Sequence, residues 1–297
     1  MRLGIDIGGT KAAIALINEK DEIVSRKKTA TGAQKTCREI AQDVAEAAKE
    51  MLSDQGKIME DVIFVGIGVP GTVDAEAKVV INAPNLNWKN EPLAEYCEAA
   101  CGKTPMLVQD TRAAAWCEAR NRREKRCVAC VTLGTGIGCG IVIDGHVWHG
   151  AMGTTGEIGH VPVVVGGRSC ACGRNGCMEA YASGTGIARS AREQHLAESS
   201  EEVFALAKQG DEKALALLSH AVTCAAAAIT AMINILSPDA LIFSGGLSEQ
   251  KELYVEPLMA KIRELAYQQA VGDGLYMGVS SFGGEAPMIG VAYMDEA

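Results

Sequence analysis

The stretch LGIDIGGTKAAIALIN, residues 3–18, decides the fold, because it predicts a strand, a glycine-rich turn and a second strand that folds back on the first. The stretch CVACVTLGTGIGCGIVIDG, residues 127–145, repeats this order in the second half of the chain. No linker of low complexity separates the two stretches. The repetition predicts two related halves that each open with a β-hairpin.

Further strand and helix patterns follow each hairpin. Apolar residues at helical spacing between residues 34 and 53 predict a helix with one buried face. The unbroken apolar run at 62–69 predicts a strand covered on both faces. The alanine-rich segment 214–236 predicts a long helix that precedes a strand at 240–243. This alternation predicts an α/β fold.

The composition is typical of a globular protein with an excess of acidic residues. The 297 residues allow one or two domains, and a net charge of −9 argues against binding to nucleic acids or anionic membrane surfaces. No apolar run reaches the roughly 18 to 20 residues of a membrane span, so we expect no membrane partner. The start, MRLGID, lacks the features of a signal peptide. We therefore expect an unprocessed cytoplasmic protein.

Two turns combine glycines with a threonine directly after a strand, Asp6–Lys11 and Gly134–Gly138. Glycine lets backbone N–H groups approach an anion, so a pair of such turns could hold two ends of a polyphosphate. A tight hairpin has the same glycine requirement and remains an alternative for either turn. The pair Gly245 and Gly246, between a strand and a helix-like segment, could contact a nucleotide or could be a packing turn.

The stretch CACGRNGCME, residues 170–179, places three cysteines within eight residues and a glutamate two positions further on. Such a stretch could form a disulfide knot, a redox centre or a metal site. The other eight of the 11 cysteines are scattered through apolar or helical segments, which favours small buried side chains in a reducing compartment.

Together, several motifs resemble the ROK family of bacterial sugar kinases and sugar-sensing repressors. They are DIGGTK at 6–11, VPG at 69–71, NAPNLNW at 82–88, GTGIG at 134–138, GEIGH at 156–160, CACGRNGCME at 170–179 and SGG at 244–246. The resemblance covers nearly the whole chain and implies an actin-like ATPase fold, with two ribonuclease-H-like lobes and an inter-lobe cleft. It implies an N-terminal lobe of residues 1–111 plus 286–297 and a C-terminal lobe, with a zinc-binding loop, of residues 112–285.

The resemblance implies an ATP-dependent hexose kinase that phosphorylates the C6 hydroxyl, with glucose as the first substrate to test. Asp110 is the expected general base. The expected zinc ligands are His160, Cys170, Cys172 and Cys177. The expected sugar-binding residues are Gly71, Asn85, Gln109, Asp110, Glu157, His160 and Glu179.

The nucleotide is expected to be bound as ATP with Mg²⁺, and Asp6 is expected to orient the metal and its waters. The expected nucleotide-binding residues are Asp6, Gly8, Gly9, Thr10, Lys11, Gly134, Thr135, Gly136, Gly138, Gly245 and Gly246. The family also implies a homodimer or a higher homo-oligomer.

One motif departs from the family. The stretch QDTR at 109–112 stands where the family usually has Asn-Asp-x-Asn. Gln109 could change which sugar epimer fits, and Arg112 could pair with Asp110 or approach a phosphate. A kinase for N-acetylmannosamine, allose or fructose therefore remains an alternative, as does a non-catalytic sugar sensor. The first strand begins at residue 3, which leaves no room for the N-terminal helix-turn-helix domain of the repressors and favours the kinase.

Overall fold

Both predicted hairpins are present in the computed structural model, which describes residues 1–32, 34–74, 76, 78–272 and 274–297. The chain divides into two compact units. Unit 1 comprises Met1–Arg123, Gly145–Thr154 and Glu285–Ala297, and unit 2 comprises Glu124–Asp144 and Thr155–Gly284. These bounds differ from the lobes expected from the resemblance, which separate residue 111 from residue 112. The difference arises because helix α3 (Asp110–Arg120) packs against α9 (Ala286–Val291) within unit 1.

The main sheet of unit 1 has the strand order β3-β2-β1-β4-β8. The hairpin strands pair antiparallel, whereas β1, β4 and β8 run parallel to one another. The strands are β1 (Arg2–Ile7), β2 (Lys11–Ile17), β3 (Ile23–Ala30), β4 (Phe64–Val69) and β8 (Met106–Gln109). A smaller antiparallel sheet contains β5 (Thr72–Asp74), β6 (Val79–Ala83) and β7 (Trp88–Glu91). The residues of the short strand β11 (His146–Val147) also fall in unit 1, but β11 belongs to neither of these two sheets.

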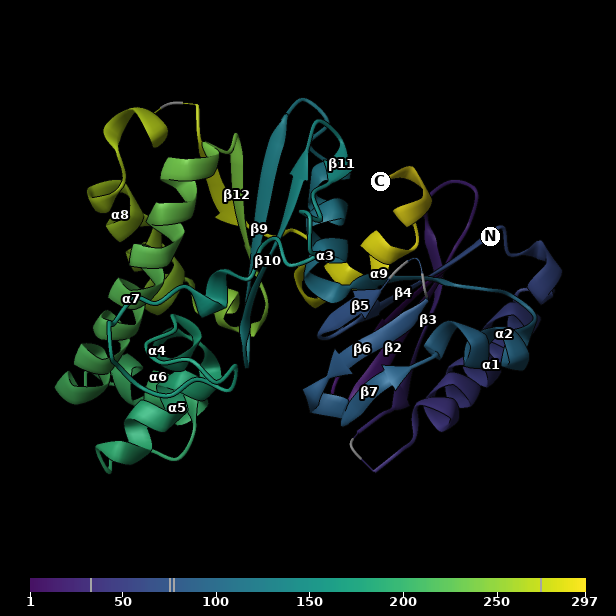
Figure 1. The fold of residues 1–297 in the computed structure, drawn as a ribbon, viewed down its shortest axis with the longest axis horizontal. Helices are drawn as coiled ribbons and strands as arrows, with labels where there is room; N and C mark the ends of the chain where they lie inside the picture. The colour runs from purple at the N-terminus through teal and green to yellow at the C-terminus, as the bar shows by residue number, and fades with distance from the viewer. Residues whose placement is uncertain (33, 75, 77, 273) are drawn as a thin grey trace. The chain divides into compact units, whose positions relative to one another are not determined.

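Helices cover both faces of this sheet. On one face, α1 (Cys37–Asp54) lies beside α2 (Leu93–Cys101), and the side chains of Leu3 and Ile5 pack into the same hydrophobic cluster as those of α1 (Figure 1). On the other face, α9 packs against β1 and β4. Helix α1 begins at Cys37 rather than at residue 34, because Thr36 and Glu39 form a reciprocal capping box.

The sheet of unit 2 repeats the plan of the first sheet. Strand β9 (Cys127–Leu133) pairs antiparallel with β10 (Ile137–Ile143) and parallel with β12 (Ala240–Ser244), which in turn pairs parallel with β13 (Tyr276–Val279). In the same way, β1 lies between the antiparallel β2 and the parallel β4. The prediction of two related α/β halves is confirmed.

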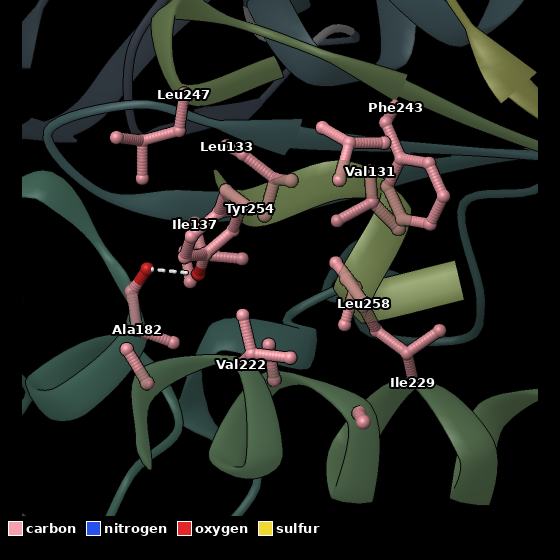
Figure 2. Close-up of a cluster of buried hydrophobic side chains, with 14 of the residues drawn as sticks. Val131, Leu133, Ile137, Ala182, Val222, Ile229, Phe243, Leu247, Tyr254 and Leu258 are labelled. Carbon is pink, nitrogen blue, oxygen red and sulfur yellow. Dashed lines mark hydrogen bonds between the residues drawn. The ribbon is translucent and has the colours of Figure 1, made fainter. Parts of the chain in front are cut away.

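The helices of unit 2 pack around one hydrophobic cluster. Figure 2 shows part of it, including Val131, Phe243 and Tyr254, whose hydroxyl donates a hydrogen bond to the Ala182 carbonyl. The helices are α4 (Glu179–Ala182), α5 (Gly184–Glu193), α6 (Ser200–Lys208), α7 (Glu212–Leu236) and α8 (Glu256–Leu265). Short 3-10 helices cover Met59–Asp61, Pro84–Leu86, Ile158–His160, Gly246–Glu249, Gln268–Ala270, Gly283–Glu285 and Met294–Glu296, and a π-helical turn covers Lys251–Val255.

Helix α7 corrects one expectation from the sequence. By length and composition this helix could cross a membrane, so the expectation that no segment is long and apolar enough is wrong. Of its most apolar 18-residue window, 61% is buried inside the protein. The helix packs against α4, α5, α6 and α8. This environment is that of a core helix, whose apolar side chains are covered by neighbouring helices.

All eleven cysteines are free thiols in the structure. Outside the stretch 170–177, six of the eight are buried, namely Cys37, Cys97, Cys117, Cys130, Cys139 and Cys224. The prediction of small buried side chains is therefore confirmed for these six.

Candidate functional site

Two carboxylates meet at the carboxyl ends of parallel strands in unit 1. Asp6 of β1 is in register with Gly68 of β4, and Asp110 follows the end of β8. A methyl group placed on Gly68 would lie 3.4 Å from Asp6 Oδ1 and 3.6 Å from Asp110 Cα. The two aspartates therefore flank the same glycine, although more than a hundred residues of sequence separate them.

The surroundings of Asp6 disfavour its charged form. Burial, and then the negative charge of Asp110, raise the pKa of Asp6 from an ordinary 3.8 to about 7, while the positive charge of Lys11 acts in the opposite direction. A carboxyl group with such a pKa is poised between its two protonation states near neutral pH. A bound cation at this place would favour the ionised form.

Asp110 is the first residue of α3. Its Oδ1 accepts a hydrogen bond from the N–H of the next residue, Thr111, at 2.7 Å. Gln109 ends β8 and is paired with Val69 of β4. The strand end and the helix start thus fix the backbone of both residues, and the bond to Thr111 engages Asp110 Oδ1.

Arg112 is buried, with 5% of its surface exposed. Its guanidinium donates a hydrogen bond to the Gly153 carbonyl and lies 3.4 Å from His149 Nδ1. A guanidinium only donates hydrogen bonds, so Nδ1 accepts and the neutral ring carries its proton on Nε2. Burial and then the charge of Arg112 lower the pKa of His149, which favours this neutral form. Arg112 therefore attaches the segment Gly145–Thr154 to the helix that begins with Asp110.

The glycine turn of unit 1 is held from the end of β3. The Gly8 N–H donates to the Lys11 carbonyl at 2.9 Å. Thr31 donates its N–H to the Thr10 carbonyl at 3.0 Å and its hydroxyl to the Gly8 carbonyl at 2.6 Å. Thr10 and Lys11 are exposed. One of the predicted sugar-binding residues, Asn85, lies beside this turn.

Asn85 contacts the turn, because a methyl group on Gly9 would lie 3.4 Å from Asn85 Cβ. Gly71 follows β4 with a φ of +105°, and a methyl group there would lie 2.2 Å from the Asn82 carbonyl oxygen. Only glycine fits this close approach at a positive φ. Gly71 therefore holds the chain after β4 against β6, whereas Asn85 is the residue that reaches the turn.

The predicted zinc ligands come together in unit 2. The ligand atoms of His160, Cys170, Cys172 and Cys177 all lie within 4.8 Å of one another. The His160 Nδ1 and Cys170 Sγ atoms are 3.6 Å apart, as are the Cys172 and Cys177 Sγ atoms. Ligands of a tetrahedral zinc ion lie about 3.6 to 3.8 Å from one another. The four residues therefore fit structural zinc in both chemistry and spacing.

His160 faces two groups of residues. Its Nδ1 points toward the cysteines, and its Nε2 lies 3.8 Å from Glu157 Oε2. A metal on Nδ1 would leave the proton on Nε2, facing the carboxylate. Glu157 is exposed and His160 is partly exposed. His160 can thus act as a metal ligand and also present a ring N–H beside Glu157.

Glu179 opens α4 two residues after Cys177, and its Oε2 accepts a hydrogen bond from the Ile137 N–H at 2.8 Å. No local pattern in the sequence predicts this contact with the second glycine turn. Gly138, predicted to bind nucleotide, lies within β10 opposite Thr132. Gly245 packs against Leu133, since a methyl group on it would lie 2.5 Å from the Leu133 carbonyl oxygen.

A pocket of about 780 Å³ opens beside this turn within unit 2. Three of the predicted nucleotide-binding residues line it, Gly134, Thr135 and Gly246. The rest of the lining comes chiefly from α5, α6 and the residues that precede α6, including Thr185, Ala188, Arg192, Glu198, Ser199, Ser200, Phe204 and Lys208.

Sequence analysis missed these helical lining residues. Ser199 caps α6 by accepting from the Glu202 N–H at 3.2 Å, so the sequence around Ser199 signals a helix start. A capping signature carries no information about a ligand. Only the packing of α5 and α6 beside the turn shows that their residues line a pocket.

Comparisons with known proteins show the family of the chain. The model of the family described as "ROK family" matches residues 2–297. A glucokinase from Halalkalibacterium halodurans is 31% identical over 98% of this chain and 94% of its own length. An N-acetylmannosamine kinase from Vibrio cholerae is 33% identical over 88% of each chain.

A solved structure is similar over the whole chain. It is a ROK family glucokinase from Streptomyces griseus in complex with glucose and AMPPNP, 31% identical, with a TM-score of 0.80 and coverage of 99% of this chain and 98% of the other. The actin-like ATPase fold that the resemblance implied is thereby confirmed.

Proposed function

The chain belongs to the ROK family, and from this premise we propose that it is an ATP-dependent sugar kinase that phosphorylates the C6 hydroxyl of a hexose. The observation that carries the proposal is the pair Asp6 and Asp110 at the carboxyl ends of parallel strands. Asp110 acts as the general base, because a carboxylate can accept the proton of the attacking hydroxyl. The glucokinase complex with glucose and AMPPNP supports this assignment of substrates.

Asp6 and Lys11 serve the phosphates in this proposal. Asp6 orients Mg²⁺ and its waters, and the metal neutralises charge on the transferred phosphoryl group when it is bound. The turns at residues 8–11 and 134–136 supply backbone N–H groups. The pocket beside Gly134, Thr135 and Gly246 supports nucleotide binding in unit 2.

Glu157, His160 and Glu179 hold sugar hydroxyls. Carboxylates accept hydrogen bonds from neighbouring hydroxyls, and the His160 N–H donates one. Zinc, held by His160 and the three cysteines, fixes the loop that carries His160 and the start of α4 that carries Glu179. Its role is structural, because all four positions of a tetrahedral ion are filled by protein ligands.

Glucose is the first substrate we propose. Its support is the likeness to glucokinases at 31 to 34% identity. N-acetylmannosamine is the main alternative, supported by the 33% identity to the N-acetylmannosamine kinase. Gln109, in place of the family's usual asparagine, leaves allose and fructose open as well.

The experiment is a coupled ADP-release assay with Mg²⁺ and ATP over a panel of hexoses and N-acetylhexosamines. We expect turnover with at least one sugar and the highest kcat/KM with glucose. The matched control is Asp110→Asn, which keeps the shape of the side chain and loses the base. Absence of turnover with every sugar would reject the kinase.

A sugar sensor without catalysis is the second candidate. The unusual stretch QDTR supports it, because Arg112 is a buried cation two residues from Asp110. Both glycine turns and Asp110 itself are retained, which favours the kinase. A sensor would bind sugar, as measured by isothermal titration, without transferring phosphate.

The assembly and location of the protein are proposed from the family alone. We propose a cytoplasmic homodimer without a nucleic-acid or membrane partner. Sedimentation analysis of the purified protein tests the oligomeric state.

A further inference from the structure

The carboxylate of Glu179 rests on the second glycine turn. Its Oε2 accepts the Ile137 N–H at 2.8 Å. A methyl group on Gly136 would lie 2.7 Å from the same oxygen and 3.5 Å from Glu179 Cδ. Only a residue without a side chain leaves room for the carboxylate at this distance, so Gly136 and Glu179 fit each other.

The same chain segment holds the other end of the turn. The Gly184 N–H at the start of α5 donates to the Gly134 carbonyl at 2.8 Å, and the Thr185 N–H donates to the Thr135 carbonyl at 3.4 Å. The Ser183 hydroxyl, which caps α5, donates to the Glu179 carbonyl at 2.8 Å. The segment from Glu179 to Thr185 therefore holds the turn on both sides.

We propose that Glu179 is a positioning residue for the nucleotide phosphates, in addition to the sugar contact assigned above, and this inference rests on the proposed kinase function. By accepting the Ile137 N–H, the carboxylate keeps the turn in one shape before the nucleotide arrives. Preorganisation of this kind reduces the entropy cost of binding. The other oxygen, Oε1, accepts no hydrogen bond from the described residues and can accept one from a sugar hydroxyl.

The charge and the hydrogen bond of Glu179 act on the nucleotide in opposite directions. A carboxylate beside a phosphate-binding turn repels the phosphates. Its hydrogen bond to Ile137, in contrast, stabilises the turn to which they bind. A variant that keeps the hydrogen bond and removes the charge therefore separates the two contributions.

The test measures nucleotide affinity without sugar, using isothermal titration of the full-length protein with AMPPNP and Mg²⁺. Glu179→Gln keeps an acceptor oxygen for Ile137 and loses the charge, whereas Glu179→Ala loses both. We expect Glu179→Gln to bind AMPPNP at least as tightly as the wild type. Glu179→Ala should bind about tenfold more weakly than Glu179→Gln. Equal affinities of the two variants would overturn the inference.

Glu157→Ala is the matched control, because Glu157 is another predicted sugar-binding glutamate and its Oε2 lies 3.8 Å from His160 Nε2. It should lower sugar affinity and leave the sugar-free AMPPNP affinity within about twofold of the wild type. A loss of AMPPNP affinity as large as that of Glu179→Ala would show that the effect does not come through the turn.

Gly136→Ala provides a second, independent test. The added methyl group displaces the carboxylate, so this variant should weaken AMPPNP binding in the wild-type background and cost nothing further in the Glu179→Ala background. Additive losses would contradict the proposal. Melting temperature and zinc content establish that each variant is folded.

Failure of the kinase proposal can be told apart from failure of this inference. A protein that binds AMPPNP and phosphorylates no sugar rejects the kinase, while the Gln and Ala comparison still decides the role of Glu179. A wild-type protein that binds no nucleotide overturns the inference.

Discussion

The β1–β2 hairpin of unit 1 and the β9–β10 hairpin of unit 2 carry different residues at equivalent positions. The last residue of β1, Ile7, pairs with Ala12, and the last residue of β9, Leu133, pairs with Ile137. Counting back one residue makes Thr132 the equivalent of Asp6. The first hairpin therefore has a carboxyl group where the second has a hydroxyl.

The carboxylate beside the second turn comes from a different element. Unit 1 carries Asp6 in the strand and holds its turn with Thr31, whereas unit 2 holds its turn with Glu179 at the start of α4. The Thr132 hydroxyl is buried and has no hydrogen-bond partner in the described part of the chain. One backbone plan thus carries a buried carboxyl group within the strand of unit 1 and a carboxylate from a neighbouring helix beside the turn of unit 2.

The comparison predicts its largest effect at Asp110. If unit 1 carries the chemistry, Asp110→Asn should lower kcat by about 10³-fold, because loss of a general base typically costs two to four orders of magnitude. The sugar affinity should change little. Glu157→Gln in unit 2 should mainly raise the sugar KM. The coupled assay measures both, and an Asp110→Asn variant within tenfold of wild-type kcat would contradict the division of roles.

Zinc removal should affect the two units unequally. We expect elemental analysis to find about one zinc per chain. Chelation of the zinc should lower the unfolding free energy of unit 2 by more than about 3 kcal/mol. It should also weaken sugar binding. The three tryptophans, Trp88, Trp116 and Trp148, all belong to unit 1. Because no tryptophan reports on unit 2, chelation should change the circular dichroism signal more than the tryptophan fluorescence. Active protein without zinc would exclude the metal site.

The raised pKa of Asp6 predicts that the unfolding free energy depends on pH. The equivalent residue of unit 2, Thr132, has no group that titrates in this range and contributes no such dependence. Native Asp6 has a pKa of about 7 and an ordinary aspartate one of 3.8, so the native state binds more protons between these values. The unfolding free energy should then fall, on the order of 3 kcal/mol, as pH rises from 4 to 7 without divalent cations.

Urea denaturation followed by tryptophan fluorescence measures this dependence. Asp6→Asn should remove the decrease, because asparagine does not titrate. An unchanged pH profile in Asp6→Asn would show that the dependence arises from other groups.

Thr132→Val should have the smallest effect. It replaces a buried hydroxyl that lacks a partner among the described residues with a methyl group of similar size. We expect unit 2 to be unchanged or stabilised by up to about 1 kcal/mol, since no hydrogen bond is lost. Thermal unfolding by calorimetry measures this, and a destabilisation above about 1 kcal/mol would show that the hydroxyl has a role.

Local patterns predicted much of the fold and part of the site. The helices α1 and α7 follow from hydrophobic spacing and capping, and the turns follow from their glycines. All of these signals act within a few residues. The three cysteines lie within eight residues, so their proximity is nearly fixed by the chain itself. The lining of the pocket by α5 and α6 could not be predicted, because it depends on how helices pack.

The sequence alone determined which residue types occur, and it predicted the two hairpins, the strand at 62–69 and the helices α1 and α7. Only the tertiary structure decided that Asp6 and Asp110 flank Gly68, that Arg112 contacts His149, and that Glu179 rests on Gly136. The physical reason is that these pairs are distant along the chain and meet through strand register and helix packing. The resulting burial and proximity of charges, which raise the pKa of Asp6, exist only after the strands have paired.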